Sequence, residues 1–140
     1  DKKIIIGYLR DGINKECQIY IRRAPKDFQS AEKYANKYLG LTVKDITYEV
    51  RDALKIPYKS PGIIVSKIEP GSPAAIGRIG LFEVIEAVDG KVIKNTGSFE
   101  KLITRAFARE KRSVKLTVRD LDKTRFIDLE LNREISPQNK

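Results

Sequence analysis

Residues 62–93, GIIVSKIEPGSPAAIGRIGLFEVIEAVDGKVI, decide the fold of this chain. The β-branched run Ile63-Ile64-Val65 is typical of a strand that is buried on both faces, and Pro70-Gly71 ends that strand with a turn. Ser72 predicts the cap of a short helix, because Pro73 follows at the first helical position, where its missing N–H costs nothing. The first half of the stretch therefore predicts a strand followed by a capped helix.

The second half of the stretch predicts another strand and a tight turn. Residues 84–88, VIEAV, form an apolar run, and Asp89-Gly90 supplies the positive φ that a tight turn requires before residues 91–93. Each of these signals is common on its own. Their order and spacing together are specific.

The segment after this stretch predicts an amphipathic helix from Ser98 to about Glu110. Its apolar residues recur at intervals of three and four positions, which is the stripe that one helix face buries. The residues of this stripe are Phe99, Leu102, Ile103, Ala106 and Phe107.

The segment before the stretch predicts a strand and a second short helix. Thr42 and Val43 begin the strand, and Thr47 caps a helix that continues to Leu54. Residues 26–37 form a polar connection in which we expect a short helix, and residues 38–41, YLGL, stand between this connection and the strand.

Each end of the chain predicts a β-hairpin. Residues 8–21, YLRDGINKECQIYI, resemble residues 117–131, TVRDLDKTRFIDLEL, with one residue of difference in the length of the turn. The hairpin of residues 4–23 is therefore an internal repeat of the closing one. Because two strands alone are marginally stable in water, we expect the first hairpin to dock on the following domain or on another copy of the chain.

Length and charge restrict the class of protein. A chain of 140 residues with 41% apolar residues has room for one domain with a real core and an additional piece. It begins at Asp1 and contains no Met, so we expect a piece of a longer protein. No apolar run approaches the roughly 18 to 20 residues of a membrane helix, and we expect no membrane insertion. The net charge of +9 favours a phosphate-rich partner, but the 28 basic residues are interleaved with 19 acidic ones, which argues against nucleic acid.

The absence of histidine restricts the chemistry further. Without it the chain has no Ser-His-Asp or Cys-His machinery, and it lacks the commonest neutral metal ligand. We therefore expect no catalytic residues, no metal and no cofactor in this fragment. The single Cys17 cannot form a disulfide within one chain, and we expect it to be a small core residue.

Taken in order, the YLGL segment, the short helix, GIIVSKIEPGSPAA, EVIEAVDGKVI, the amphipathic helix and the closing hairpin resemble PDZ domains of the HtrA/Deg-type serine protease family. The resemblance covers residues 37–133 and implies an α+β, mainly β fold, a partly open β-barrel or sandwich with two to three helices. Residues 1–25 resemble the terminal hairpin of a preceding PDZ domain, residues 26–36 would be a linker and residues 134–140 a tail. The family usually has Gly-Asp where this chain has Phe82-Glu83.

The resemblance also implies a groove that binds a peptide as an added β-strand. A loop would receive the terminal carboxylate through its backbone N–H groups, with Gly40 providing the unusual φ, and the following strand would pair with the peptide. The loop and strand residues are Tyr38, Leu39, Gly40, Leu41, Thr42 and Val43. A simpler interpretation is that Gly40 only begins a strand.

The amphipathic helix would form the opposite wall of this groove. By the family match, Phe99, Ile103 and Ala106 would face the peptide, and Leu102 and Phe107 would pack inward. The alternative is that the whole stripe belongs to the core.

The leading functional hypothesis is a module that captures C-terminal or unfolded, extended peptides ending in an apolar residue. By resemblance it would serve an HtrA-like serine endopeptidase in the periplasm or another cell-envelope compartment. One alternative is an assembly role, in which the domain contacts other domains or subunits and self-associates through residues 1–25. Another is a PDZ domain from a different type of protease.

Overall fold

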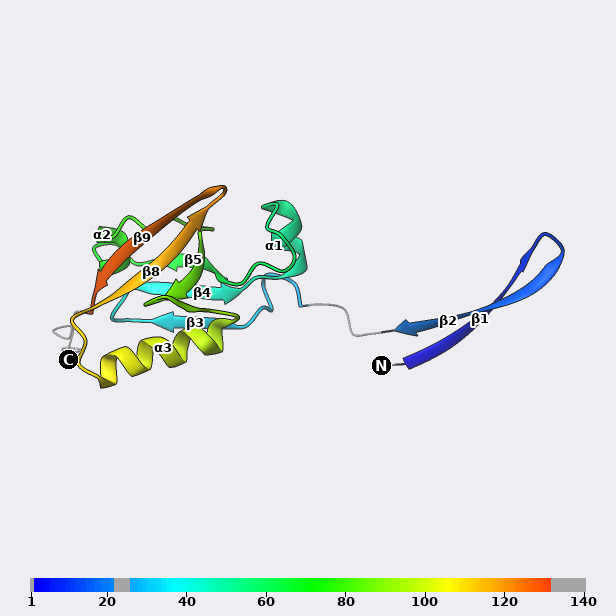
Figure 1. Ribbon diagram of the computed structural model, residues 1–140, viewed down its shortest axis with the longest axis horizontal. Coiled ribbons are helices and arrows are strands. Elements are labelled where there is room, and N and C mark those ends of the chain that lie inside the picture. The colour runs from blue at the N-terminus through cyan, green and yellow to red at the C-terminus, as the bar shows by residue number, and fades with distance from the viewer. Residues whose placement is uncertain (1, 22–25, 132–140) are drawn as a thin grey trace.

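The structure is a computed structural model that describes residues 2–21 and 26–131 (Figure 1). The predicted tail, residues 134–140, lies outside the described residues. In chain order the elements are β1 (Lys2–Arg10), β2 (Ile13–Ile21), β3 (Lys33–Asn36), β4 (Leu41–Asp45), α1 (Tyr48–Ala53), β5 (Ile63–Ile68), α2 (Pro73–Ile76), β6 (Val84–Val88), β7 (Lys91–Val92), α3 (Thr96–Ala108), β8 (Ser113–Asp120) and β9 (Lys123–Glu130).

One open sheet contains all the strands from β3 onward. Its order is β3-β4-β5-β6-β8-β9, with β7 paired to β6, and all neighbouring strands are antiparallel. Helix α3 packs against β3, β4 and β6, whereas α2 packs against β9 (Figure 1). The fold is α+β and mainly β, with three helices among the described residues, and this confirms the predicted class.

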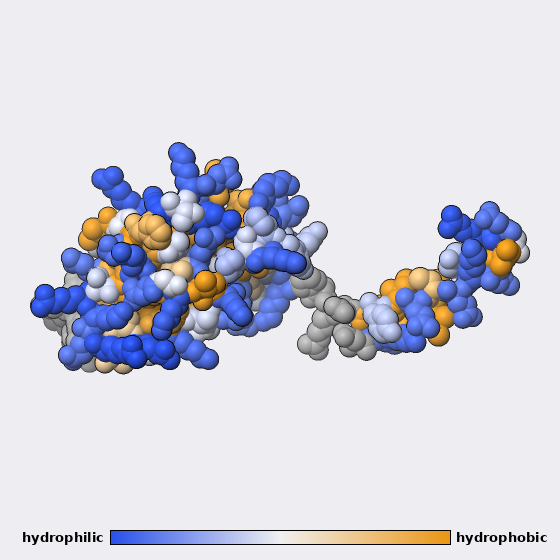
Figure 2. Space-filling view, in the orientation of Figure 1, coloured by the Kyte–Doolittle hydropathy of each residue, from blue (hydrophilic) through white to orange (hydrophobic). Residues whose placement is uncertain are grey.

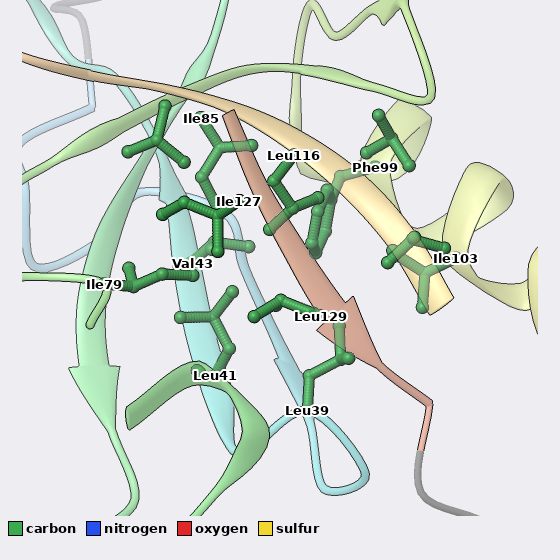
Figure 3. Packing of buried hydrophobic residues seen from close by; sticks show 14 of the residues in the cluster. Leu39, Leu41, Val43, Ile79, Ile85, Phe99, Ile103, Leu116, Ile127 and Leu129 are labelled. Carbon is green, nitrogen blue, oxygen red and sulfur yellow. The ribbon is translucent and has the colours of Figure 1, made fainter. Parts of the chain in front are cut away.

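The predicted buried strand is the centre of the core. Ile63, Ile64 and Val65 in β5 have no exposed surface. Ile63 and Val65 belong to a cluster of buried side chains from strands and helices of the fold, and burying each such side chain contributes about 1.5 to 3 kcal/mol of transfer free energy. Figure 3 shows part of this cluster, whose labelled members are Leu39, Leu41, Val43, Ile79, Ile85, Phe99, Ile103, Leu116, Ile127 and Leu129.

The helix cap and the tight turn predicted from residues 62–93 are confirmed. The Ser72 Oγ accepts a hydrogen bond from the Ala75 N–H at 3.2 Å and caps α2, with Pro73 in its first turn. Asp89 and Gly90, with φ of 48° and 76°, form the two-residue turn between β6 and β7. Thr47 caps α1 as predicted, and Asn95 caps α3 three positions before Ser98.

The loop that departs from the family pattern adopts the conformation that glycine usually provides. Phe82 has a φ of 65°, in the left-handed region that costs a side-chain residue about 1 to 2 kcal/mol. The neighbouring Glu83 carboxylate offsets this cost, because it accepts hydrogen bonds from the Gly80 N–H at 2.9 Å and from Arg125 Nη2 at 2.7 Å.

The short helix expected in residues 26–37 is wrong. Residues 33–36 form strand β3 instead, and this strand pairs with β4. Tyr34 and Asn36 alternate along it and lie opposite Val43 and Leu41, so the segment gains ladder hydrogen bonds and an inward face that a local helix lacks. The sheet therefore extends into the residues that we predicted as a linker, ahead of position 37.

The predicted first hairpin forms over residues 2–21, and positions 22 and 23 of the prediction lie outside the described residues. Its turn is Asp11-Gly12, between the paired residues Arg10 and Ile13. Its two strands pair only with each other, and their side chains are largely exposed, as the orange residues at the right of Figure 2 illustrate. Docking on the following domain is therefore not observed, and the core position expected for Cys17 is wrong because its thiol is exposed.

The two hairpins are more alike than the sequence comparison predicted. The closing hairpin also has a two-residue turn, since Asp120 pairs with Lys123. The expected difference in turn length is therefore wrong, and the turn is shifted by one position instead. No helix in residues 2–21 or 26–131 has the length and apolar character needed to cross a membrane.

Candidate functional site

The loop between β3 and β4, residues 37–40, is fixed against the start of α2. The carbonyl oxygen of Leu39 accepts a hydrogen bond from the Ala74 N–H at 3.1 Å, and the carbonyl of Gly40 accepts one from the Glu69 N–H at 2.8 Å. The Leu39 side chain is fully buried in the core. The loop is therefore rigidly held by the same strand–helix motif that decides the fold.

Gly40 is required in this loop for two reasons. Its φ is 63°, a conformation that residues with a Cβ adopt at a cost. A Cβ atom at this position would also lie 2.1 Å from the Ser72 Cβ. The loop can therefore approach the cap of α2 only with glycine at position 40.

The loop holds an oxygen acceptor supplied by the chain itself. The Leu39 N–H donates a hydrogen bond to the Asn36 Oδ1 at 3.0 Å. Asn36 is only 8% exposed, and its Nδ2 donates to the Tyr34 hydroxyl at 3.0 Å. A carboxamide oxygen and a carboxylate oxygen are both acceptors for a backbone N–H, so the geometry that binds Asn36 also suits a carboxylate.

Strand β4, which we predicted to pair with a peptide, has a strand on each side. It pairs with β5 along one edge and with β3 along the other. Leu41 and Val43 are buried, and Thr42 is half-buried. The edge of β4 that faces α3 is therefore covered by residues 33–36 (Figure 1).

Strand β3 presents one face to the helix. The Asp45 N–H donates a hydrogen bond to the Glu32 carbonyl at 2.9 Å. In an antiparallel ladder, hydrogen-bonded and non-hydrogen-bonded residue pairs alternate, so Tyr34 and Val43, two positions further along, also form a hydrogen-bonded pair. The Tyr34 ring packs edge-on against the Phe99 ring of α3, with centroids 6.0 Å apart. Lys33 and Ala35 lie on the opposite face and are exposed.

The depth of burial along α3 differs from the one that we expected. Phe99 and Ile103 have no exposed surface and Ala106 is 4% exposed, so these three residues belong to the core. Leu102 and Phe107, which we expected to pack inward, are half-buried at its margin. The apolar stripe predicted the helix correctly, but its periodicity does not show which residues of a broad stripe are most deeply buried.

Tyr38 lies beside the helix rather than in the core. It is 42% exposed, and its ring lies 5.0 Å, centroid to centroid, from that of Phe107. The structure thus brings the predicted loop, strand β4 and helix α3 together around the strand position between β4 and α3. The residues that occupy this place, Tyr34 and Asn36, were missed by the sequence analysis.

The connection into β3 contains two carboxyl groups, Asp27 and Glu32, whose pKa values are lowered by hydrogen bonds. A hydrogen bond from the Ser30 side chain lowers the pKa of the Asp27 carboxyl, and a hydrogen bond from the Lys26 side chain lowers the pKa of the Glu32 carboxyl. In the part of the chain that the structure describes, no group of three His, Cys, Asp or Glu residues is placed to hold a metal ion.

The chain is similar in sequence to two named bacterial proteases. It is 29% identical over 129 residues to a "probable periplasmic serine endoprotease DegP-like" of Chlamydia pneumoniae, covering 92% of this chain and 25% of that protein. It is 33% identical over 73 residues to a protein of the same name from Brucella suis, covering 52% of this chain and 14% of that protein. The chain thus spans a quarter or less of the length of these relatives. No family model matches it.

The chain is similar in structure to the HtrA3 PDZ domain, solved with the phage-derived ligand FGRWV. The TM-score is 0.54 at 20% sequence identity, and the match covers 71% of this chain and 84% of the other. The fold is therefore that of a PDZ domain. Together with the names of the sequence relatives, this makes the chain similar to a PDZ domain of a DegP-like protease. The fragment does not contain the catalytic domain of such a protease, whose histidine is absent from these residues.

Proposed function

We propose that this PDZ domain captures the C-termini of proteins, or extended segments of unfolded proteins, by strand addition to β4. The incoming segment takes the position beside α3 that β3 holds, and its terminal carboxylate binds the residue 37–40 loop. The observation that carries this proposal is the hydrogen bond from the Leu39 N–H to the Asn36 Oδ1, because it places an oxygen acceptor in that loop at the end of an antiparallel strand.

The comparisons support the same proposal. The structural neighbour is bound to a peptide with a valine at its end, and the sequence relatives are named periplasmic endoproteases. We therefore propose that the domain serves an HtrA-like protease in a cell-envelope compartment. It would tether or present substrates to that protease.

The test is a calorimetric titration of the domain with FGRWV as a free acid and as its C-terminal amide. We expect the free acid to bind with a Kd in the micromolar range, about −8 kcal/mol. The amide should bind at least tenfold more weakly, because charge-assisted hydrogen bonds to a carboxylate are roughly twice as strong as neutral ones. Equal affinities for acid and amide would remove the carboxylate-binding loop from the proposal.

An assembly role is a second candidate, favoured by the apolar face of the first hairpin. In the closing hairpin the alternate residues Leu116 and Ile127 are buried in the core. In the first hairpin, Ile6 of β1 and Ile19 of β2 lie on the same face of the two strands, and they are 45% and 43% exposed. An uncovered apolar face with two open strand edges is suited to pair with a further PDZ body or with a second copy of the chain.

We expect sedimentation velocity to show concentration-dependent self-association of the chain. The double variant Ile6→Lys with Ile19→Lys should abolish it, because both charges fall on the apolar face. Ile5→Lys is the matched control, since Ile5 is 58% exposed on the other face of the same strand. A monomer at all concentrations, or equal loss with Ile5→Lys, would contradict association through this face.

A further inference from the structure

We infer that β3 is an internal occupant of the peptide site, a tethered pseudo-ligand that a peptide must displace. This inference rests on the proposed function, and it concerns how that site is regulated. It is carried by three features of residues 33–36: their pairing with β4, their contact with α3 and their hydrogen bond to the residue 37–40 loop.

The first feature is the direction and position of the strand. β3 runs antiparallel to β4, with its last residue, Asn36, opposite the first residue of β4, Leu41. A peptide added to β4 with its C-terminus at the loop has this same direction. Because an edge of a strand offers one set of ladder hydrogen bonds, β3 and an added peptide cannot pair with it at once.

The second feature is the use of alternate side chains. Tyr34 projects to the side of the Phe99 ring, and Asn36 projects to the loop, while Lys33 and Ala35 face away. An added strand contributes every second side chain to the pockets beside it, which is the pattern that β3 reproduces. Residues 33–36 therefore fill both the strand position and the side-chain positions of a ligand.

The third feature is the acceptor at the end of the strand. The Asn36 carboxamide oxygen accepts from the Leu39 N–H in the place that the proposed function gives to a carboxylate. The amide is neutral, so its hydrogen bond is weaker than the one that a carboxylate makes. A free C-terminus therefore has an electrostatic advantage over β3 at this atom.

The strand is also held weakly enough to be released. It has four residues, and Tyr34 is its one apolar side chain packed on the core. On its N-terminal side Ala31 is buried, but the polar contacts lie near the surface, where the Lys44 ammonium donates to the Phe28 carbonyl at 2.8 Å and lies 4.6 Å from the centre of the Phe28 ring. Short segments with few buried contacts open locally at low cost.

Competition from a tethered strand lowers the apparent affinity for peptide. The apparent Kd equals the intrinsic Kd divided by the fraction of molecules in which the site is open. Tyr34→Ala removes the contact with Phe99 and raises this fraction. We expect it to tighten FGRWV binding about tenfold, whereas Lys33→Ala, on the outward face of the same strand, should leave the affinity within twofold.

The decisive experiment locks β3 in place. Ala35 and Thr42 are directly opposite in the ladder and form a non-hydrogen-bonded pair, in which Cα atoms are about 4.5 Å apart, within the range that a disulfide spans. The variant Ala35→Cys with Thr42→Cys is made in a Cys17→Ser background, because Cys17 is a free exposed thiol. FGRWV binding is then measured by titration calorimetry in the oxidised and the reduced protein.

We expect the oxidised protein to lose FGRWV binding and the reduced protein to regain it. Binding of equal strength in both states would overturn the inference, since a locked β3 would then not obstruct the ligand, even though peptide capture itself would stand. Absence of binding in every protein, including Tyr34→Ala, would overturn the proposed function together with the inference. Near-ultraviolet circular dichroism of both redox states checks that the lock leaves the fold intact.

Discussion

Replacing Ile103 with Asp is expected to unfold the domain. Ile103 has no exposed surface and lies in the core between α3 and the sheet (Figure 3). A carboxylate there loses its hydration without gaining a partner, and we expect a loss of more than about 4 kcal/mol in the free energy of unfolding. Small domains are stable by about 5 to 15 kcal/mol, so a loss of this size unfolds a domain whose stability lies at the low end of that range.

The matched control is Leu102→Asp, one position along the same helix. Leu102 is half-buried, so its substituted carboxylate can reach water, and we expect a loss of about 1 to 2 kcal/mol. Urea titrations followed by circular dichroism measure both values. A folded Ile103→Asp protein beside an unfolded Leu102→Asp protein would restore the helix faces inferred from the sequence.

Replacing Gly40 with Ala is expected to cost about 2 to 5 kcal/mol of stability. The left-handed φ of 63° accounts for about 1 to 2 kcal/mol, and the overlap of the new Cβ with Ser72 adds a packing cost of about 1 to 3 kcal/mol. The same displacement of the loop from the cap of α2 should weaken FGRWV binding, because the Leu39 N–H moves with it.

Gly71→Ala separates the two contributions. Gly71 has a similar φ of 73°, but a Cβ at this position meets no atom within 4 Å. It should therefore lose only the conformational part, about 1 to 2 kcal/mol. The free energies of unfolding of the two variants, determined in one urea series, give the steric part as their difference. Equal losses would show that the contact between Gly40 and Ser72 relaxes freely.

The parts of the fold that local chemistry dictates were predictable from the sequence. The β-branched run at residues 63–65, the Ser72-Pro73 helix start and the Asp89-Gly90 turn each act within a few residues, and all three are confirmed. The stripe on α3 was predictable for the same reason, since it reflects the period of the helix itself.

The features that the sequence did not predict depend on contacts between distant segments. Strand β3 has one apolar residue facing the core, Tyr34, and its composition KYAN gives no strong strand preference. It becomes a strand because β4 offers an edge and α3 offers the Phe99 ring. The only signal in the sequence was the two-residue spacing of Tyr34 and Asn36, which is too short to distinguish from chance.

The candidate site was predicted in part, and the missing part is its occupant. The YLGL loop, β4 and α3 do meet in one place, and Gly40 has the positive φ that the loop was expected to need. The family resemblance carries information about a groove shared by many chains. It carries none about a segment of this chain that lies in that groove, because such a segment is absent from the shared pattern.

The four-residue turn between β3 and β4 has a consequence for how this chain tolerates change in length. In a strand, a shift of one residue exchanges the two faces. One residue inserted or removed at positions 37–40 would turn Tyr34 and Asn36 outward and bring Lys33 and Ala35 against α3 and the loop. Surface loops usually accept insertions, but the length of this loop determines which side chains of β3 face α3. Its length is therefore as constrained as the identity of a core residue.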